Sequence, residues 1–320
     1  MIESLSFDET LSALRAASER TRLRLLIILQ KSELTVSELT RILGQSAPRV
    51  SRHLKVLFDN HLIERNQEGT WVFYRVVDRG PALPVVRALV DLVPTAEFDI
   101  QKDMERLEMV QLENREVATA YFERNAKKWD EICQRYVPET KIENVLLEML
   151  DGRNIENLLD VGTGTGRMLE VLGGSVTRGL GIDLNPEMLA VARMNLRRSG
   201  LRHCQVRQGD LYNLKVENRT VDLVVLHQVL HFLDDPAAAI RESVRTLVPG
   251  GVMIIVDFSP HKHEFLRTEH THRRLGFSDK EIITWLADSG ASLKASRRLD
   301  VKEPETPGEN LTVSIWMAGV

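Results

Sequence analysis

The chain has 320 residues, 43% of them hydrophobic, so we expect two globular domains. Its formal net charge of −4 at pH 7 excludes a globally basic nucleic-acid-binding protein but is compatible with a local basic face. No apolar run is long enough to cross a bilayer, and the acidic start at residues 1–4 lacks the pattern of a signal peptide. Two cysteines, Cys133 and Cys204, are too few for a disulfide framework, and we therefore expect a soluble, cytoplasmic protein with no membrane partner.

The first part of the chain, residues 1–80, carries short helical patterns followed by a β-rich ribbon. Thr35-Val36-Ser37-Glu38 is a capping box and predicts that a helix begins there. Gly44-Gln45-Ser46 predicts a tight turn, and a second helix is expected from near Ser46 because Pro48 is tolerated in a first turn. The runs 62–65 and 71–76 flank a glycine-bearing turn and predict a β-hairpin wing.

Residues 10–79 resemble the winged-helix regulators of the ArsR family. Residues 17–26 match that family's first-helix signature, and residues 51–57 match its recognition helix. The resemblance implies binding to double-stranded operator DNA. The expected DNA-binding residues are Ser46, Arg49, Ser51, Arg52, His53, Lys55 and Arg65.

Two further features of this region bear on its ligands. Residues 41–79 hold seven Lys and Arg against four acids, a local positive excess that suits contact with phosphates. Metal-sensing members of the ArsR family carry Cys-Val-Cys where this chain has Thr35-Val36-Ser37. The usual metal site is therefore missing, and we expect the signal to enter through the rest of the chain.

Residues 81–137 are expected to form a helical connector, because neither Gly nor Pro interrupts residues 96–137. An apolar seam recurs at three- and four-residue spacing, with Asp103 as a polar break; its members are Ile100, Leu107, Val110, Asn114, Val117 and Tyr121. The seam predicts either a homodimer, as in ArsR-like regulators, or packing on the chain's own domains. Residues 121–130 resemble the lid helix of small-molecule methyltransferases, and the alternative is that Tyr121, Phe122 and Trp129 are core or interface residues.

From about residue 155, strand and helix patterns alternate, which predicts a parallel α/β sheet. A strand ends at Asp160 and Val161 and is followed by Gly162-Thr163-Gly164-Thr165-Gly166 and a helix, an arrangement that places bare backbone against a ligand. The next strand ends at Asp183, about 20 residues after the first glycine, where a carboxylate meets ribose hydroxyls. A dinucleotide fingerprint requires glycine where this chain has Arg167, so the spacing favours adenosylmethionine over NAD.

Residues 120–320 resemble the class I S-adenosylmethionine-dependent methyltransferases, with a Rossmann-like α/β fold expected over 138–320. The resemblance implies S-adenosyl-L-methionine or S-adenosyl-L-homocysteine as the ligand, with Leu184 on the adenine face and Asp210 at the adenine edge. The expected cofactor-binding residues are Asp160, Gly162, Gly164, Gly166, Asp183, Leu184, Asp210, Leu211, His227 and Gln228. A fifth strand is predicted over 252–256, after a turn at 247–251, and residues 303–308 predict a hairpin loop before the last strand.

Candidate bases for methyl transfer lie where the predicted strands end. They are His227, His231, Asp257, His261 and His263, and the alternative for each is ordinary polar packing. Six of the nine histidines lie between residues 227 and 272. Their spacing disfavours a metal site, so this segment predicts either a lid over an acceptor or a solvated basic helix that includes Arg267, Arg273 and Arg274.

Two functions follow from these patterns. The first is a transcription regulator whose methyltransferase-like domain binds either adenosyl ligand as a signal. The second is an active methyltransferase on a small-molecule acceptor, with the winged helix controlling its own gene. A DNA methyltransferase is less compatible, because neither an Asn-Pro-Pro-Tyr-like run nor a Pro-Cys pair follows the fourth strand of the predicted sheet.

Overall fold

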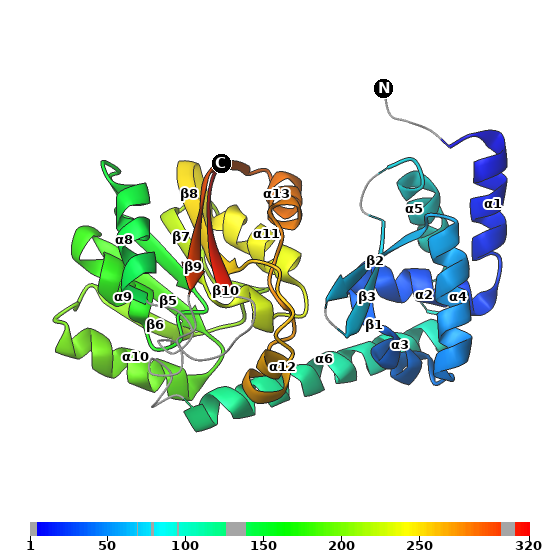
Figure 1. Cartoon of the computed structure of the whole chain (residues 1–320), viewed down its shortest axis with the longest axis horizontal. Coiled ribbons are helices and arrows are strands. Elements are labelled where there is room, and N and C mark those ends of the chain that lie inside the picture. Colours follow the sequence, from blue (N-terminus) through cyan, green and yellow to red (C-terminus); the bar gives the residue numbers. More distant parts are fainter. Residues whose placement is uncertain (1–4, 69, 78–79, 95, 126–138, 302–310) are drawn as a thin grey trace. The chain divides into compact units, whose positions relative to one another are not determined.

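The structure is a computed structural model that describes residues 5–68, 70–77, 80–94, 96–125, 139–301 and 311–320. Its contacts divide the chain into two compact units, Met1–Glu116 and Val117–Val320, which are described one at a time (Figure 1). The division falls inside helix α6 (Phe98–Asn125). The domain limits at residues 80 and 137 stay predictions. No described helix combines the length and apolarity needed to span a bilayer.

The first unit contains the predicted helix-turn-helix and the predicted hairpin. Its elements before α6 are α1 (Phe7–Ala17), α2 (Arg20–Lys31), β1 (Leu34–Thr35), α3 (Val36–Leu43), α4 (Ala47–Asp59), β2 (Ile63–Glu68), β3 (Trp71–Val76) and α5 (Leu83–Asp91). The capping box at α3 is confirmed, because the Thr35 hydroxyl accepts from the Glu38 backbone N–H and the Glu38 carboxylate accepts from the Thr35 N–H. Gly44, with φ of 64°, ends α3 in the left-handed conformation that favours glycine.

Helices α5 and α6 contribute to the same hydrophobic core as the helix-turn-helix. Val86 of α5 and Leu107 and Val110 of α6 are buried among side chains of α2, α3 and α4. The predicted seam is therefore, at these positions, the face that packs on the chain's own first unit. Asp103, the polar break in the seam, lies on the buried face itself, where its fully buried carboxylate accepts two hydrogen bonds of 2.6 Å from the guanidinium of Arg24.

The second unit is a three-layer α/β structure around a seven-stranded sheet, and its class I methyltransferase-like topology confirms the predicted fold. The strand order is β6-β5-β4-β7-β8-β10-β9, in which the first five are parallel and β10 is antiparallel to both of its neighbours. The strands are β4 (Asn157–Val161), β5 (Arg178–Asp183), β6 (Cys204–Gln208), β7 (Val221–His227), β8 (Leu247–Phe258), β9 (Ser292–Val301) and β10 (Leu311–Gly319). The helices are α8 (Glu139–Leu150), α9 (Arg167–Leu172), α10 (Pro186–Arg198), α11 (Pro236–Thr246), α12 (Phe265–His270) and α13 (Asp279–Asp288), with short 3-10 helices η2 (Gly173–Ser175) and η3 (Leu230–Phe232).

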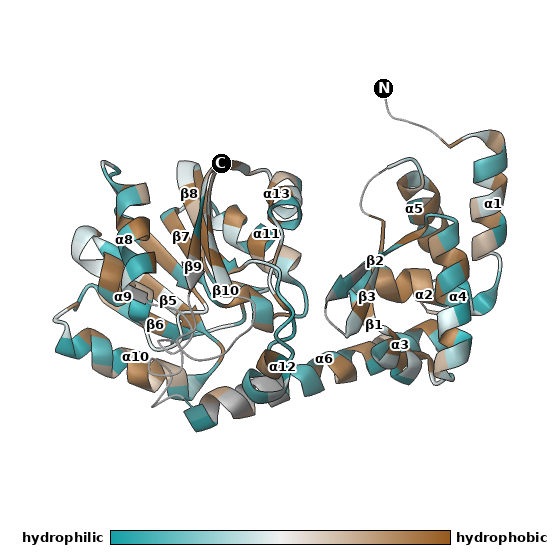
Figure 2. Cartoon of the chain, in the orientation of Figure 1, coloured by the Kyte–Doolittle hydropathy of each residue, from teal (hydrophilic) through white to brown (hydrophobic). Residues whose placement is uncertain are grey.

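Both faces of this sheet are buried, which explains why its inner strands are continuous apolar runs (Figure 2). In β7, Leu223 and Val225 pack in the cluster that contains α8, α9 and α10 side chains, whereas Val224 and Leu226 pack in the cluster with α11 and α13. Successive side chains of a strand point to opposite faces, so each apolar residue of β7 has a layer to pack against.

Two details differ from the sequence expectations or lie beyond them. The sequence predicted a turn at 247–251 and a strand from residue 252, and this start of the strand is wrong. Strand β8 already begins at Leu247, which pairs with Val221, and the register of the two strands shifts between Val221 and Leu223. The predicted hairpin loop at 303–308 lies outside the described residues, although β9 and β10 on either side of it are paired antiparallel. The parallel strands β4 to β8 all end at the same edge of the sheet, and the chain order reverses between β4 and β7, where ligands bind in open α/β sheets.

Candidate functional site

The glycine-rich loop follows β4 and leads into α9. Gly162, Gly164 and Gly166 have φ values of 76°, 52° and 84°, a region that side chains with a Cβ rarely occupy. A Cβ at Gly162 would lie 2.4 Å from Cγ2 of Val229, so the loop also needs this glycine for close packing. The amide of Gly162 donates to the Ile182 carbonyl at 2.7 Å, which fixes the loop against the end of β5.

Asp160 lies beneath this loop. Its side chain is buried, and its carboxylate accepts a 2.6 Å hydrogen bond from the Thr163 hydroxyl. Burial raises the pKa of Asp160 to about 7, with the charge of Asp183 adding to the rise. Asp160 therefore supports the loop through Thr163, and its contact with the ligand stays a prediction.

Asp183 ends β5 beside the loop. Its two carboxylate oxygens accept from the backbone amides of Gly164 and Asn185, each at 2.9 Å. Desolvation raises the pKa of Asp183, while these amide bonds act in the opposite direction. A carboxylate has about four acceptor positions, so two remain for ribose hydroxyls. The next residue, Leu184, is 42% exposed, which leaves its side chain available to an adenine ring.

Asp210 follows β6, the neighbour of β5. The Gly209 amide donates to the Asp183 carbonyl at 3.0 Å, which brings the two strand ends together. The Asp210 carboxylate accepts from the Tyr212 amide at 2.9 Å, and Leu211 between them is buried. Asp183 and Asp210 thus lie at adjacent strand ends, the arrangement that the sequence predicted for ribose and adenine contacts.

His227 and Gln228 lie at the end of β7, across the reversal in strand order from the glycine loop. Burial lowers the pKa of His227 to about 4, so its imidazole is neutral at pH 7. Gln228 has a left-handed φ of 49°, and its amide donates to the Val256 carbonyl at 2.7 Å. This strained turn is followed directly by Val229, whose side chain packs on Gly162.

The candidate bases lie at the carboxyl ends of β7 and β8 and in the segments that follow them. Nδ1 of His231 lies 2.8 Å from the Asp257 carboxylate, and both side chains are almost fully buried. The imidazole centroids of His261 and His263 are 5.3 Å apart. Among the residues that the structure describes, no group of three or more His, Cys, Asp or Glu side chains could hold a metal ion.

The interpretation of residues 267–274 as a solvated basic helix is wrong. Arg267, Arg273 and Arg274 are each at most 9% exposed. Arg273 forms a 2.7 Å ion pair with Asp234, and α12 ends at His270 before the other two arginines. The periodicity of charges could not reveal this burial, because Asp234, the acid that pairs with Arg273, lies outside this segment.

The lid residues are described only in part. The ring of Phe122 meets the ring of Phe232 edge-on, with centroids 4.8 Å apart. The side chain of Tyr121 and the whole of Trp129 lie outside the described residues. This ring contact reaches the residue next to His231.

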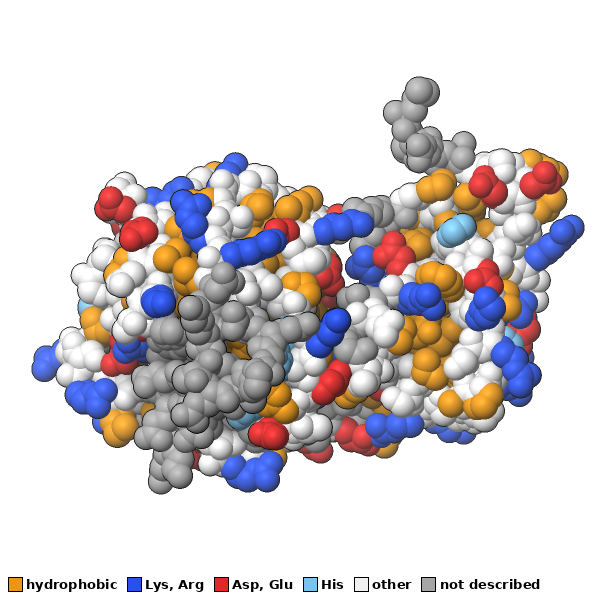
Figure 3. Space-filling model, in the orientation of Figure 1, with side chains coloured by type: hydrophobic (Ala, Val, Ile, Leu, Met, Phe, Trp, Pro, Cys, Tyr) orange, Lys and Arg blue, Asp and Glu red, His pale blue; other side chains and the backbone are white. Residues whose placement is uncertain are grey.

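Helix α4 presents the predicted DNA-binding residues to solvent. Its exposed members are Ser46 at the N-cap, Arg49, Ser51, Arg52 and Lys55, whereas Val50, Leu54 and Leu57 are buried on the other face. Lys55 pairs with Asp59 at 2.9 Å. Within the described residues, the side chains of Arg49 and Arg52 form no ion pair or hydrogen bond, so both guanidinium groups are available to phosphates or bases. Figure 3 shows cationic and anionic side chains interspersed on the visible face of the molecule.

His53 and Arg65 differ from the rest of the predicted DNA-binding set. His53 is mostly buried, with Nδ1 3.4 Å from the Glu19 carboxylate, and desolvation lowers its pKa. Arg65, on β2, is exposed and lies over the Phe58 ring at 4.7 Å. His53 of α4 therefore contacts Glu19, the N-cap residue of α2, and its contact with DNA stays a prediction.

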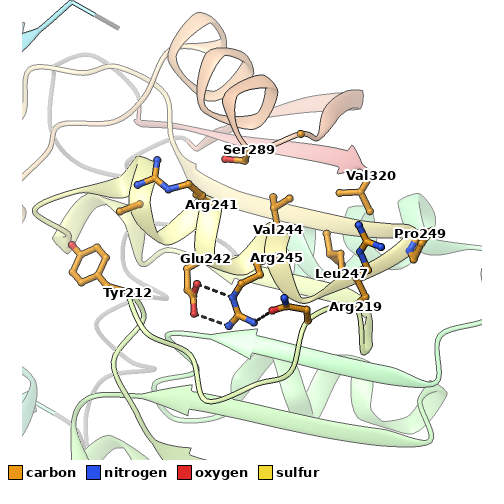
Figure 4. A pocket seen from close by; sticks show the side chains of 13 residues that line it. Tyr212, Arg219, Arg241, Glu242, Val244, Arg245, Leu247, Pro249, Ser289 and Val320 are labelled. Atoms are coloured by element: carbon orange, nitrogen blue, oxygen red, sulfur yellow. Dashed lines mark hydrogen bonds and ion pairs between the residues drawn. The ribbon is translucent and has the colours of Figure 1, made fainter. Parts of the chain in front are cut away.

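A separate cavity of about 830 Å³ lies at the other end of β8 (Figure 4). Tyr212, Arg241, Glu242 and Leu247 are among the residues that line it. Arg245 in its wall donates to Glu242 at 2.7 and 2.9 Å, so that pair is internally satisfied. No predicted site residue lines this cavity, and Leu247 is at the opposite end of β8 from Asp257.

Comparison with known proteins supports two domain types. Residues 159–255 match the family model of a methyltransferase domain, and residues 19–65 match that of bacterial regulatory proteins of the arsR family. A 37.1 kDa protein of transposon TN4556 from Streptomyces fradiae is 36% identical over 115 residues, or 35% of this chain and 33% of that protein. A ubiquinone biosynthesis O-methyltransferase of Vibrio parahaemolyticus is 30% identical over 135 residues, or 41% of this chain and 57% of that enzyme. The chain thus spans less than two thirds of the length of either relative.

A solved structure extends the likeness of fold. Magnesium protoporphyrin IX methyltransferase from Synechocystis PCC 6803, with bound S-adenosylhomocysteine, aligns with a TM-score of 0.51 at 16% identity. The alignment covers 64% of this chain and 99% of that protein. The chain therefore joins an arsR-type helix-turn-helix domain to a domain of the methyltransferase fold.

Proposed function

We propose that this protein is a DNA-binding transcription regulator whose methyltransferase-fold domain binds S-adenosylmethionine or S-adenosylhomocysteine as its signal. The observation that carries the proposal is the occurrence, in one chain, of an exposed cationic helix α4 and of the carboxylates of Asp183 and Asp210 at adjacent strand ends. The bare glycine loop beside Asp183 supplies backbone groups for the rest of an adenosyl ligand.

Helix α6 is the proposed route between the two activities, because it belongs to both units. Near its middle, the Asn114 amide donates to the Glu38 carboxylate of the α3 capping box at 3.1 Å. Near its end, Phe122 contacts Phe232, one residue from His231. A ligand that changes the packing at Phe232 can therefore bias the helix that supports the helix-turn-helix.

The decisive test is operator affinity with each ligand. The two ligands differ by one methyl group and one positive charge at sulfur, and a ligand shifts an equilibrium only through differential affinity for its two states. We expect one ligand to change operator affinity at least several-fold more than the other; tenfold corresponds to about 1.4 kcal/mol. The measurement is fluorescence anisotropy on a duplex selected from a random library, with each ligand saturating.

Linkage supplies the internal control for this test. If a ligand changes operator affinity by some factor, the operator must change the affinity of that ligand by the same factor. Calorimetry with and without the duplex measures the second factor. Three identical anisotropy curves, without ligand and with either ligand, would contradict the signalling role.

The recognition helix has a test of its own. Replacing Arg52 with alanine should weaken operator binding by about 1–3 kcal/mol if the guanidinium contacts a base, because a bidentate contact is lost. If Arg52 contacts only phosphate, the loss should be equal on specific and random duplexes, with a flatter salt dependence. Arg202→Ala, at an exposed site of the other unit, is the control. Unchanged binding by Arg52→Ala would remove this position from the interface.

A second candidate function is methyl transfer to a small-molecule acceptor, with the winged helix controlling the chain's own gene. The observation that favours it is the buried His231–Asp257 pair at the carboxyl ends of β7 and β8, where a base for an acceptor belongs. The O-methyltransferase named among the relatives is compatible with it. Release of adenosylhomocysteine that requires an added acceptor would establish this function.

A further inference from the structure

The five imidazoles of His227, His231, His261, His263 and His272 and the carboxylate of Asp257 form what we call the histidine cluster. The His231 and His272 rings are stacked with centroids 4.1 Å apart, and Phe258 lies 5.3 Å from His231 and 5.7 Å from His261. His227 belongs to the same cluster, because it ends β7 and pairs in the sheet with Val256, the residue before Asp257. Side chains from β7, β8 and the segments that follow these strands thus meet at one edge of the sheet.

Several polar atoms of the cluster are buried without a hydrogen-bond partner. They are Nε2 of His227, His261 and His263, Nδ1 of His272 and Oδ2 of Asp257. More than nine in ten buried polar groups in proteins have a partner, and leaving one without costs about 1–3 kcal/mol. So many unsatisfied atoms in one cluster indicate a place where a bound molecule supplies the missing hydrogen bonds.

Within the cluster, His231 is held as a base. Asp257 is buried, and its Oδ1 also accepts from the Phe258 amide at 2.8 Å, so the carboxylate is fixed. Its contact with Nδ1 of His231 makes Nδ1 the protonated nitrogen, which leaves a lone pair on Nε2. Among the described residues, no hydrogen bond to this Nε2 is found. The His231 carbonyl accepts from the Arg273 and Arg274 amides at 2.9 and 3.0 Å, which fixes the backbone as well.

Charge and shape restrict what the cluster can hold. Burial lowers the pKa of His261 to about 3 and that of His227 to about 4, so these imidazoles bring no positive charge to attract an anion. Two guanidinium groups of the adjoining segment are engaged, Arg273 with Asp234 and Arg267 with Glu264. The surrounding Phe232, Phe258 and His272 rings favour a flat, neutral molecule. A carboxylic acid would already be ionised at pH 7 and would not need the base, whereas a phenol, with a pKa of about 10, would.

We propose that the histidine cluster binds a neutral aromatic hydroxyl compound as methyl acceptor and that Nε2 of His231 removes its hydroxyl proton. This inference rests on the second candidate function. The acceptor oxygen forms a bond to the methyl carbon of S-adenosylmethionine as the carbon–sulfur bond breaks, and the electron pair of that bond stays on sulfur. The products are the aryl methyl ether, S-adenosylhomocysteine and an imidazolium, whose charge Asp257 stabilises until the proton leaves to water. Asp257 is a positioning residue, and His231 is the catalytic residue.

Two acceptors and two variants test the assignment on the full chain. The acceptors are an unsubstituted catechol, which is neutral at the assay pH, and a nitrophenol that is already ionised there. For His231→Asn we expect the rate with catechol to fall by about 10²–10⁴-fold, because general-base catalysis contributes that much, and the rate with the nitrophenolate to fall far less. Asp257→Asn should show the same contrast, since it acts by setting the tautomer of His231. His61→Asn, at an exposed histidine of the first unit, should leave both rates unchanged.

A second readout does not depend on turnover. In the complex with S-adenosylhomocysteine, the wild-type protein should bind the nitrophenol as its phenolate below the pH at which it ionises in solution, seen as its absorbance change, and His231→Asn should abolish this shift. Equal loss with both acceptors, or failure of the wild-type protein to bind and methylate either, would overturn the inference. Calorimetry of S-adenosylhomocysteine binding in the same samples distinguishes failure of this inference from failure of the proposed function. If the adenosyl ligand does not bind, the proposed function itself is wrong; if it binds and the acceptors fail, only this inference is wrong.

Discussion

Replacing Asp103 with alanine should lower the free energy of unfolding of the first unit by about 3–5 kcal/mol, because the change leaves a buried charge on Arg24 without its partner. The carboxylate is fully buried, and it accepts both hydrogen bonds of the Arg24 guanidinium at 2.6 Å. Asp103 raises the pKa of Arg24, but a guanidinium is protonated at pH 7 even without a carboxylate partner, so the arginine stays charged when the acid is removed. Urea unfolding, with hydrogen exchange of the α2 and α6 amides to report on this unit, measures the loss.

The chain offers a matched control for this change. Asp99, one turn earlier in α6, pairs with Arg20 at 2.9 Å, but that arginine side chain is 68% exposed. Asp99→Ala should therefore cost less than about 1 kcal/mol. Replacing Arg24 and Asp103 together by Met and Leu should recover most of the stability, since no unpaired charge remains. Equal losses for Asp99→Ala and Asp103→Ala would show that burial of the pair is unimportant.

The second large effect concerns the adenosyl ligand. Asp183→Ala should weaken binding of S-adenosylhomocysteine by about 10²–10⁴-fold, because two hydrogen bonds to a charged acceptor contribute about 1.5–3 kcal/mol each. The same change also removes the acceptor of the Gly164 amide, so the glycine loop loses part of its support. Calorimetry measures the affinity, and operator binding by the free protein should stay at the wild-type value.

Asp222→Asn separates the loss of ligand contacts from the loss of backbone support. Asp222 also accepts from backbone amides, those of Glu156 and Asn157 at 3.2 and 2.8 Å, but it lies at the start of β7, away from the strand ends that form the site. This variant should keep its affinity for S-adenosylhomocysteine. A wild-type affinity in Asp183→Ala would show that the ribose is not bound at this carboxylate.

Much of the candidate site could be predicted because its signals are local. Gly162, Gly164 and Gly166 all have positive φ, a conformation that glycine adopts without steric cost, so the residue type itself indicates it. Asp183 ends the strand that follows the glycine loop in the chain. The separation of about 20 residues between the first glycine and this acid therefore predicted both positions together. The direction of the α4 side chains was predictable for the same reason, since helical periodicity separates Arg49 and Arg52 from the buried Val50 and Leu54.

The connector shows where local pattern stops being informative. Its three- and four-residue spacing correctly marked Ile100, Leu107 and Val110 as one buried face of α6. Spacing cannot state what covers such a face, and here it is the core of the chain's own first unit. Asp103 lies on the same buried face although it is polar, because it is paired there with Arg24. That partner lies 79 residues earlier, beyond the reach of any local pattern.

The sequence by itself thus determined the two domain types, the order of the elements, the glycine loop and the acids at the strand ends, because caps, periodicities and turn residues act between neighbours in the chain. Only the tertiary structure decided which distant groups meet: Arg24 with Asp103, His231 with Asp257, and Arg273 with Asp234. Each of these pairs is buried, and the stability of a buried charge depends on whether a compensating group is brought within hydrogen-bond distance. That distance is set by the packing of whole helices and strands, which no local pattern in the chain records.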